Sequence, residues 1–132
     1  MKILFVCTGN SCRSPMAELY FNALAEEHRS SLKAESAGIY ANDGGLISRS
    51  AAGVMRELEI DSSSFRSAAF TPKRAQEYDL MIGMTRTHAA LMRHIVPELA
   101  ERVRTLIPGA DVPDPFGGSI GEYTVFHYFD CF

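Results

Sequence analysis

Four short apolar runs alternate with amphipathic segments along this chain of 132 residues. A strand covered on both faces carries consecutive apolar residues, so the runs predict buried strands at residues 2–6, 32–36, 80–82 and 103–107. Between them, apolar residues recur at helical spacing, which predicts helices at residues 14–24, 48–58, 71–76 and 85–96. This alternation is typical of an α/β sandwich around a parallel sheet. No repeat or linker divides the chain, so we expect a single domain over residues 1–132.

The composition excludes several classes of protein. With 46% hydrophobic and 22% charged residues, the chain can bury a core, which a disordered chain cannot. No apolar run approaches the roughly 20 residues of a membrane span, and the N-terminal run is too short for a signal peptide. The net charge is −3 and the 13 lysines and arginines are scattered, which does not favour a nucleic-acid partner. We expect a cytoplasmic protein that binds neither membranes nor nucleic acids.

The cysteines and histidines do not predict a metal site. Cys7, Cys12 and Cys131 are too few, and too unevenly spaced, for a disulfide scaffold or a zinc site, so we expect Cys7 and Cys12 to be thiols in a reducing compartment. His88 and His94 fall on one predicted helix without a cluster of cysteines or carboxylates near them in the sequence. For these histidines we expect solvated or capping roles.

The segment between the first strand and the first helix carries the candidate chemistry. Residues 6–15 read Val-Cys-Thr-Gly-Asn-Ser-Cys-Arg-Ser-Pro, with Cys7 at the end of a buried strand and Arg13 six positions later. Ser14 is a good N-cap and the proline after it fits a first helical position, so a helix is expected directly after the arginine. Gly9 permits a tight turn. Such a loop can turn backbone N–H groups inward beside a helix N-terminus, which predicts an anion site.

The side chains of this loop suit phosphoryl transfer. Inward N–H groups favour the thiolate of Cys7, the form that attacks phosphorus, and Arg13 can hold two phosphoryl oxygens with its planar guanidinium. The alternatives are that Cys7 is a buried thiol of the core and that Arg13 is a charge on the surface. Ser14 either caps the helix only or also donates its hydroxyl to the thiolate, and we expect Asn10 to brace the loop. Cys12 is either packed core or a partner for Cys7 in a protective disulfide.

A carboxylate near the C-terminus suits the proton transfers of such a reaction. The leaving group needs a proton and a water must then lose one, and one carboxyl can serve both steps. Asp114 stands between two prolines, and a rigid segment places a side chain at low entropic cost. The alternative is a simple Asp-Pro turn. Phe116 and Tyr40 are candidates for pocket walls, and the alternative for each is a place in the core. Phe116 is the better candidate because it adjoins the acid, whereas for Tyr40 we expect the core.

These residues resemble the low-molecular-weight protein tyrosine phosphatases, whose signature is a Cys-x5-Arg-Ser-Pro loop and a later Asp-Pro pair, here residues 7–15 and Asp114-Pro115. Further matches stand at residues 16–18, 36–38 and 79–84 and at His88. The resemblance implies a four-stranded parallel sheet flanked by helices on both faces, phosphorylated protein substrates, a cysteinyl-phosphate intermediate, and no metal or organic cofactor. It gives Cys7 the role of nucleophile, Arg13 that of phosphate ligand, and Asp114 that of general acid and then base. We assign the substrate-binding positions to Thr8, Gly9, Asn10, Ser11, Cys12, Ser14 and Phe116, and expect a monomer.

Two features distinguish this sequence within the family it resembles. Many tyrosine-specific members hold Ile or Leu at the position of Ser11, whereas bacterial protein-arginine phosphatases hold Thr there and an Asp-Pro-Phe-Gly-Gly-Ser string like residues 114–119. Phosphoarginine and phosphotyrosine both stay open as substrates, with phosphoarginine slightly ahead. Family members usually finish with a full helix, whereas this sequence ends at Phe132, so we expect a shortened C-terminal helix.

Two other functions use a similar loop. Thioredoxin-coupled arsenate reductases resemble the chain in fold and loop, but they need two more cysteines to relay a disulfide, and Cys131 alone cannot complete that relay. A non-catalytic phospho-residue binder or redox sensor would use Cys7 and Cys12 and would not need Asp114.

Overall fold

The protein is a three-layered α/β sandwich, and the computed structural model describes residues 1–108 and 110–112. In this part of the chain, four strands form one sheet in the order β2-β1-β3-β4, and every pairing is parallel. The strands are β1 (Lys2–Cys7), β2 (Lys33–Gly38), β3 (Leu80–Gly83) and β4 (Val103–Thr105). The predicted four-stranded parallel sheet is therefore confirmed.

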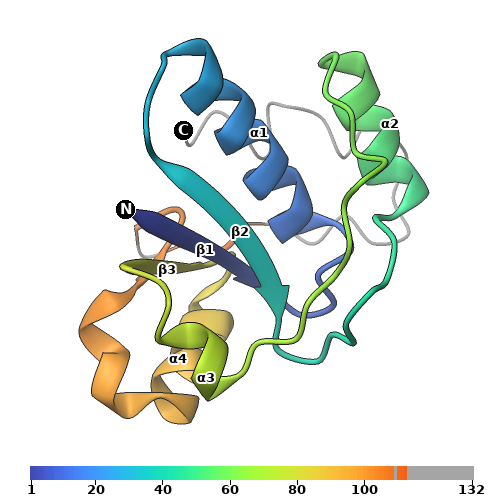
Figure 1. The fold of residues 1–132 in the computed structure, drawn as a ribbon. Coiled ribbons are helices and arrows are strands. Elements are labelled where there is room, and N and C mark those ends of the chain that lie inside the picture. The colour runs from blue at the N-terminus through green and yellow to red at the C-terminus, as the bar shows by residue number, and fades with distance from the viewer. Residues whose placement is uncertain (109, 113–132) are drawn as a thin grey trace.

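Helices cover both faces of the sheet, as predicted. Helices α1 (Arg13–Glu27) and α2 (Arg49–Glu57) lie on one side, and α3 (Pro72–Ala75) and α4 (Arg86–Ile95) lie on the other (Figure 1). A 3-10 helix, Pro97–Arg102, connects α4 to β4. Helices α2, α3 and α4 begin where the sequence suggests. The side chains of Ser48, Thr71 and Thr85 cap them, because each accepts a hydrogen bond from the backbone N–H three residues later.

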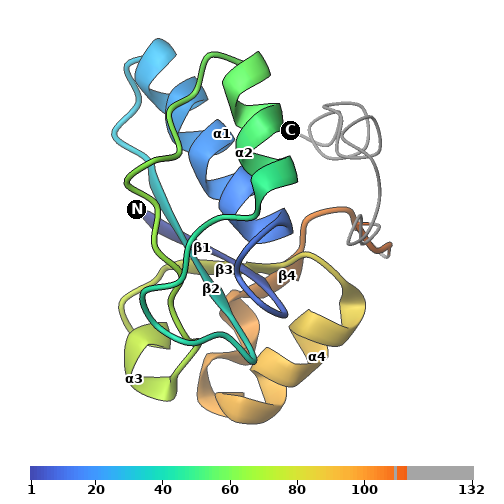
Figure 2. The ribbon, with the colours of Figure 1, turned by 90° about the vertical axis from the view of Figure 1, so that its right-hand side faces the viewer.

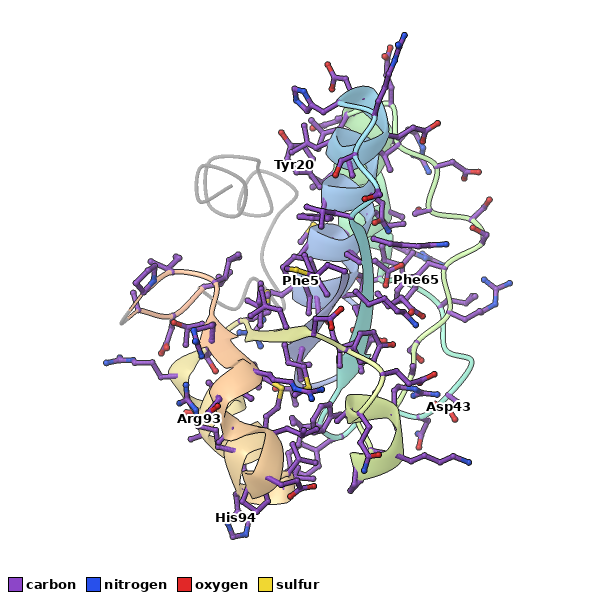
Figure 3. The ribbon with its side chains drawn as sticks, turned by 60° about the vertical axis from the view of Figure 1, so that its left-hand side comes forward. Phe5, Tyr20, Asp43, Phe65, Arg93 and His94 are labelled. Carbon is purple, nitrogen blue, oxygen red and sulfur yellow. The ribbon has the colours of Figure 1, made fainter. Side chains whose placement is uncertain are left out.

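The position of β1 inside the sheet explains why its sequence is continuously apolar. Strand β1 pairs with β2 on one edge and β3 on the other, and its alternate residues enter two separate cores. Phe5 (labelled in Figure 3) packs with α1 and α2. Its ring meets that of Phe21 edge-on, at 6.0 Å between centroids. Leu4 and Val6 pack on the opposite face with α4.

Some element boundaries differ from the prediction. The second strand continues through Gly38 because its pairing with β1 extends to Cys7, and tertiary pairing outweighs a glycine's weak strand preference. Helix α1 continues three residues beyond the predicted end, to Glu27. Ala25 is still buried, whereas Glu26 and Glu27 are exposed and polar, so the apolar periodicity does not extend to the end of the helix. The fourth strand ends at Thr105, two residues early.

The strand order places the functional site. The chain leaves β1 toward α1 on one face and leaves β3 toward α4 on the other face (Figure 2). Neighbouring parallel strands whose connections diverge in this way leave a crevice outside their carboxyl ends, where ligands bind in open α/β sheets. Cys7 ends β1 at this crevice.

Candidate active site

The predicted phosphate loop runs from the end of β1 to the start of α1, with the thiol of Cys7 at its base. This side chain is buried, 3% exposed. Its sulfur accepts the backbone N–H of Asn10 at 3.3 Å and lies 2.9 Å from the hydroxyl oxygen of Ser14. The thiol therefore faces polar hydrogens from the loop and from the first turn of the helix.

The carbonyl groups of the loop point outward. The segment after β2 donates N–H bonds to three of them: Ile39 to Cys7 at 3.0 Å, Tyr40 to Thr8 at 3.0 Å, and Ser48 to Ser11 at 2.8 Å. The C=O and the next N–H of a trans peptide point in opposite directions. The N–H groups that follow these carbonyls, those of Thr8, Gly9 and Cys12, therefore point away from that segment, as an anion-binding loop requires.

Asn10 braces the loop, as expected, and sets the direction of its hydrogen bonds. The side chain is fully buried, and its carbonyl oxygen accepts the backbone N–H of Ala68 at 2.8 Å. Its amide group must then donate to Ser14 Oγ and Ser36 Oγ, each at 2.9 Å. Ser14, which accepts from Asn10, has one hydrogen to donate, and its two possible acceptors are the Cys7 sulfur at 2.9 Å and the Ala37 carbonyl oxygen at 3.5 Å. A thiolate at Cys7 can only accept, so that form of Cys7 takes the hydrogen at the shorter distance.

Ser14 is not the helix N-cap that the sequence suggested. Helix α1 begins at Arg13, Cys12 occupies the cap position, and no side chain caps the helix. The Ser14 hydroxyl is buried inside the first turn, where it contacts Cys7 and Asn10 and lies 3.5 Å from the carbonyl oxygen of Ala37. The tertiary contact with the thiol takes the place of the local cap.

The expectation for Gly9 is also corrected. The left-handed residue of the loop is Asn10, with φ at 51°, a conformation that asparagine tolerates. A Cβ added to Gly9 would meet nothing closer than Ser11 Oγ at 3.7 Å. The glycine that the loop requires is Gly38 on β2, where an added Cβ would lie 2.6 Å from the Thr8 carbonyl oxygen and 2.9 Å from the Asn10 nitrogen.

A carboxyl group ends the hydrogen-bonded network on the side away from the thiol. Ser36 donates its hydroxyl to Glu18 Oε1 at 2.6 Å. Burial raises the pKa of Glu18 to about 7, against the opposing effect of the Ser36 hydrogen bond, and Glu35 on β2 raises it further. Glu18, Ser36, Asn10, Ser14 and Cys7 thus form one continuous chain of contacts.

Arg13 lies at the first residue of α1 and its side chain is 8% exposed, so it is not a surface charge. Its guanidinium donates to the carbonyl oxygen of Val112 at 3.3 Å. That contact joins the loop to the segment that precedes Asp114. Asp114 and Phe116, the predicted acid and pocket wall, lie outside the described residues.

Two side chains at the loop differ from what the sequence suggested. His88 is neither solvated nor a cap: it is 5% exposed, and its Nε2 lies 2.8 Å from Thr8 Oγ1. Tyr40 is not core, because 74% of it is exposed, on the segment that donates to the Thr8 carbonyl. The match to the family at His88 was a sequence signal that this residue lies near the site, whereas no local pattern predicts that Tyr40 is exposed.

Other features of the described residues bear on cofactors and redox state. Within residues 1–108 and 110–112, no group of three or more histidine, cysteine or acidic side chains could hold a metal ion. Cys7 and Cys12 are free thiols, so a regulatory disulfide between them stays a prediction. No helix in the described ranges is long and apolar enough to cross a membrane.

Comparison with known proteins shows extensive similarity. Residues 2–128 match the low molecular weight phosphotyrosine protein phosphatase family. The chain is 37% identical over 128 residues to a protein-arginine-phosphatase of Bacillus subtilis, covering 93% of this chain and 85% of that protein. It is similar to the structure of a low molecular weight protein tyrosine phosphatase from T. tengcongensis, with a TM-score of 0.92, 34% identity, and coverage of 99% and 92%. It is also similar to a YwlE arginine phosphatase variant with a phosphorylated active-site serine, with a TM-score of 0.89, 35% identity, and coverage of 96% and 86%.

Proposed function

Because this chain belongs to the low molecular weight phosphotyrosine protein phosphatase family and is a protein phosphatase, we propose that it hydrolyses phosphoarginine or phosphotyrosine residues through a cysteinyl-phosphate intermediate. The observation that carries this proposal is the placement of the Cys7 sulfur. It lies at the base of a loop that begins at the carboxyl end of a central strand, with the Asn10 N–H at 3.3 Å and the Ser14 hydroxyl at 2.9 Å.

The reaction proceeds in two steps. The Cys7 thiolate attacks phosphorus, the bond from phosphorus to the substrate oxygen or nitrogen breaks, and Asp114 gives its proton to the leaving group. Asp114 then takes a proton from water, which attacks the phosphoenzyme and releases phosphate and the thiolate. Arg13 binds phosphoryl oxygens throughout. Ser14 stabilises the departing thiolate by donating its hydroxyl hydrogen.

A related structure supports the intermediate. One YwlE arginine phosphatase similar to this chain carries a phosphorylated serine in its active site. A phosphoryl group on an active-site side chain is what in-line attack by such a residue produces. In this chain, we assign that position to Cys7.

Phosphoarginine is the substrate that the loop favours. Ser11 is half-buried, and its backbone carbonyl is held by the Ser48 N–H at 2.8 Å, so its short side chain lies on a constrained part of the loop. A small hydroxyl leaves room and a hydrogen-bonding partner for a guanidinium-phosphate, whereas Ile or Leu would offer an apolar flank to a flat ring. The similarity to protein-arginine-phosphatases agrees with this choice.

One observation favours phosphotyrosine as the second candidate. Tyr40 is 74% exposed, and its backbone N–H is bonded to the loop at the Thr8 carbonyl. An exposed aromatic ring beside the loop can stack on a phenyl ring in offset geometry. The similarity to protein tyrosine phosphatases agrees with this alternative.

The test compares kcat/KM on phosphoarginine and phosphotyrosine peptides of matched sequence, with Cys7→Ser as the inactive control. We expect phosphoarginine to be preferred, and Ser11→Ile to shift the ratio toward phosphotyrosine by about tenfold, a typical effect of one pocket contact. Ser11→Thr keeps the hydroxyl and serves as the matched control, with the ratio of wild type. A ratio that Ser11→Ile does not change would refute the role of Ser11.

The same assay separates the other functions. If neither peptide is hydrolysed while Cys7 is still alkylated by iodoacetamide, the chain is a binder or redox sensor. Arsenate reduction driven by thioredoxin would favour the reductase. Our expectations of a cytoplasmic monomer, of a single domain over residues 1–132 and of no cofactor stay predictions.

A further inference from the structure

A buried histidine joins the two sides of the crevice at the carboxyl ends of β1 and β3. Thr8 follows β1 directly, within the phosphate loop, whereas His88 lies in the first turn of α4, which follows β3. Its Nε2 lies 2.8 Å from Thr8 Oγ1 and its Nδ1 lies 2.9 Å from Thr85 Oγ1. The ring thus bonds to Thr8, a residue 80 positions before His88 in the chain.

The position of this ring is fixed from its own helix. Thr85 is the N-cap of α4 and accepts the backbone N–H of His88 at 3.1 Å, as well as contacting the ring. The start of α4 lies so close to β3 that a Cβ added to Gly83 would be 3.1 Å from the Cβ of His88 and 2.8 Å from the Ala89 nitrogen. The backbone under the ring therefore has little room to move.

Both ring contacts are hydrogen bonds in any protonation state. A neutral imidazole has one N–H donor and one acceptor nitrogen, and an imidazolium has two donors. The hydroxyls of Thr8 and Thr85 can each donate or accept, so each can pair with whichever form of the His88 nitrogen faces it. The contact with the loop does not depend on a particular tautomer.

The loop needs such support on the Thr8 side. Asn10 and Ser14 are buried and bonded to several partners, whereas Thr8 and Gly9 are exposed, and a Cβ added to Gly9 would meet only the Ser11 hydroxyl oxygen, at 3.7 Å. Exposed residues next to a glycine have the most conformations open to them. A bond from a buried, anchored ring to Thr8 removes much of that freedom.

We propose that His88 is a positioning residue, which holds the Thr8 side of the phosphate loop in the conformation that receives the phosphoryl group. It acts through the Thr8 hydroxyl and does not touch the substrate. This inference rests on the proposed function only in treating the loop as the phosphoryl-binding site.

The start of α4 also supports the segment that precedes Asp114. The backbone N–H of Arg86 donates to Asp111 Oδ1 at 2.8 Å, and this bond, with the nearby Arg86 and His88 side chains, holds the pKa of Asp111 below its usual range. The N–H of Val112 donates to the Met84 carbonyl at 2.8 Å. The turn that carries His88 therefore contacts both the loop and this segment.

The test uses substitutions that keep one ring contact at a time. An asparagine amide reaches about as far as Nδ1 and a glutamine amide about as far as Nε2, so His88→Asn loses the Thr8 contact and His88→Gln can restore it. Thr8→Val removes the hydroxyl at nearly constant volume. His94→Asn is the matched control, because His94 lies on the same helix and its side chain points away from the molecule (Figure 3).

The readouts are kcat and KM with p-nitrophenyl phosphate, and the affinity for inorganic phosphate by titration calorimetry. We expect His88→Asn and Thr8→Val each to lower kcat/KM about tenfold and to weaken phosphate binding, the usual loss for one hydrogen bond. The double variant should be no worse than either single one, because both remove the same bond. His88→Gln should recover most of the loss, and His94→Asn should match wild type.

Two results would overturn the inference. One is losses that multiply in the double variant, since independent effects show that His88 and Thr8 do not act as a pair. The other is His88→Gln as impaired as His88→Asn, which would show a packing role alone. Absence of turnover in wild type would refute the proposed function instead, while phosphate binding still tests the role of His88. Thr8→Val changes an exposed residue, so the test does not depend on His88→Asn folding.

Discussion

Replacing Glu18 by glutamine is expected to remove a loss of stability that the wild-type protein undergoes as the pH rises toward neutrality and above. The Glu18 carboxyl is bonded to the Ser36 hydroxyl at 2.6 Å, and its burial, with a smaller effect of the Glu35 charge, raises its pKa to about 7. Glutamine has nearly the same shape and keeps an oxygen for the Ser36 hydroxyl, but it cannot ionise.

The sign follows from proton binding in the two states. In the unfolded chain the carboxyl loses its proton near its ordinary pKa of 4.5, whereas in the folded protein it keeps the proton until about pH 7. Between these values the folded state binds more protons, so its stability falls as the pH rises. At about 1.4 kcal/mol for each pH unit between the two pKa values, the full loss is roughly 3 to 4 kcal/mol.

Urea denaturation of both proteins at about pH 5 and about pH 8 measures this effect as a difference in the free energy of unfolding. The difference in the free energy of unfolding between Glu18→Gln and wild type should rise in favour of the variant by about 2 to 3 kcal/mol from the lower pH to the higher. Glu26→Gln, the same change at an exposed site of α1, is the matched control and should show no such gain. If wild type and Glu18→Gln change in parallel with pH, burial at Glu18 does not disfavour the charged form and the reasoning is wrong.

Two substitutions test the geometry of the loop. Gly38→Ala places a Cβ 2.6 Å from the Thr8 carbonyl oxygen, so the loop must shift; we expect kcat/KM for p-nitrophenyl phosphate to fall at least about tenfold, and an unchanged value would contradict the close approach. Ser14→Ala removes the hydroxyl that lies 2.9 Å from the Cys7 sulfur. It should slow release of the thiolate from the phosphoenzyme, lowering kcat about tenfold or more while stopped-flow measurements still show a rapid burst of nitrophenolate. Equal loss of burst and steady-state rates would contradict this role.

The strands and helices of the fold and the loop after the first strand could be predicted from the sequence because they are local patterns. Continuous apolar residues at 2–6 predict a strand buried on both faces, and Cys7 and Arg13 stand on either side of one short turn. Helix starts at Ser48, Thr71 and Thr85 are equally local, since a cap depends only on residues within one turn. Where the local preference of a segment agrees with the tertiary structure, the sequence of that segment is enough to predict its secondary structure.

The partners of the loop side chains were decided only by the tertiary structure. Ser14 precedes a proline, as a helix N-cap often does, yet its hydroxyl lies within hydrogen-bonding distance of the Cys7 thiol that the fold brings beside it. His88 meets Thr8 because β3 pairs with β1, and Gly38 meets the loop because β2 pairs with β1 on the other edge. The apolar pattern of a strand is the same whichever neighbours it has, so strand order is not written in the periodicity. The sequence by itself therefore determined the elements and the candidate residues for the chemistry, and the packing of the sheet decided which distant side chains contact the loop.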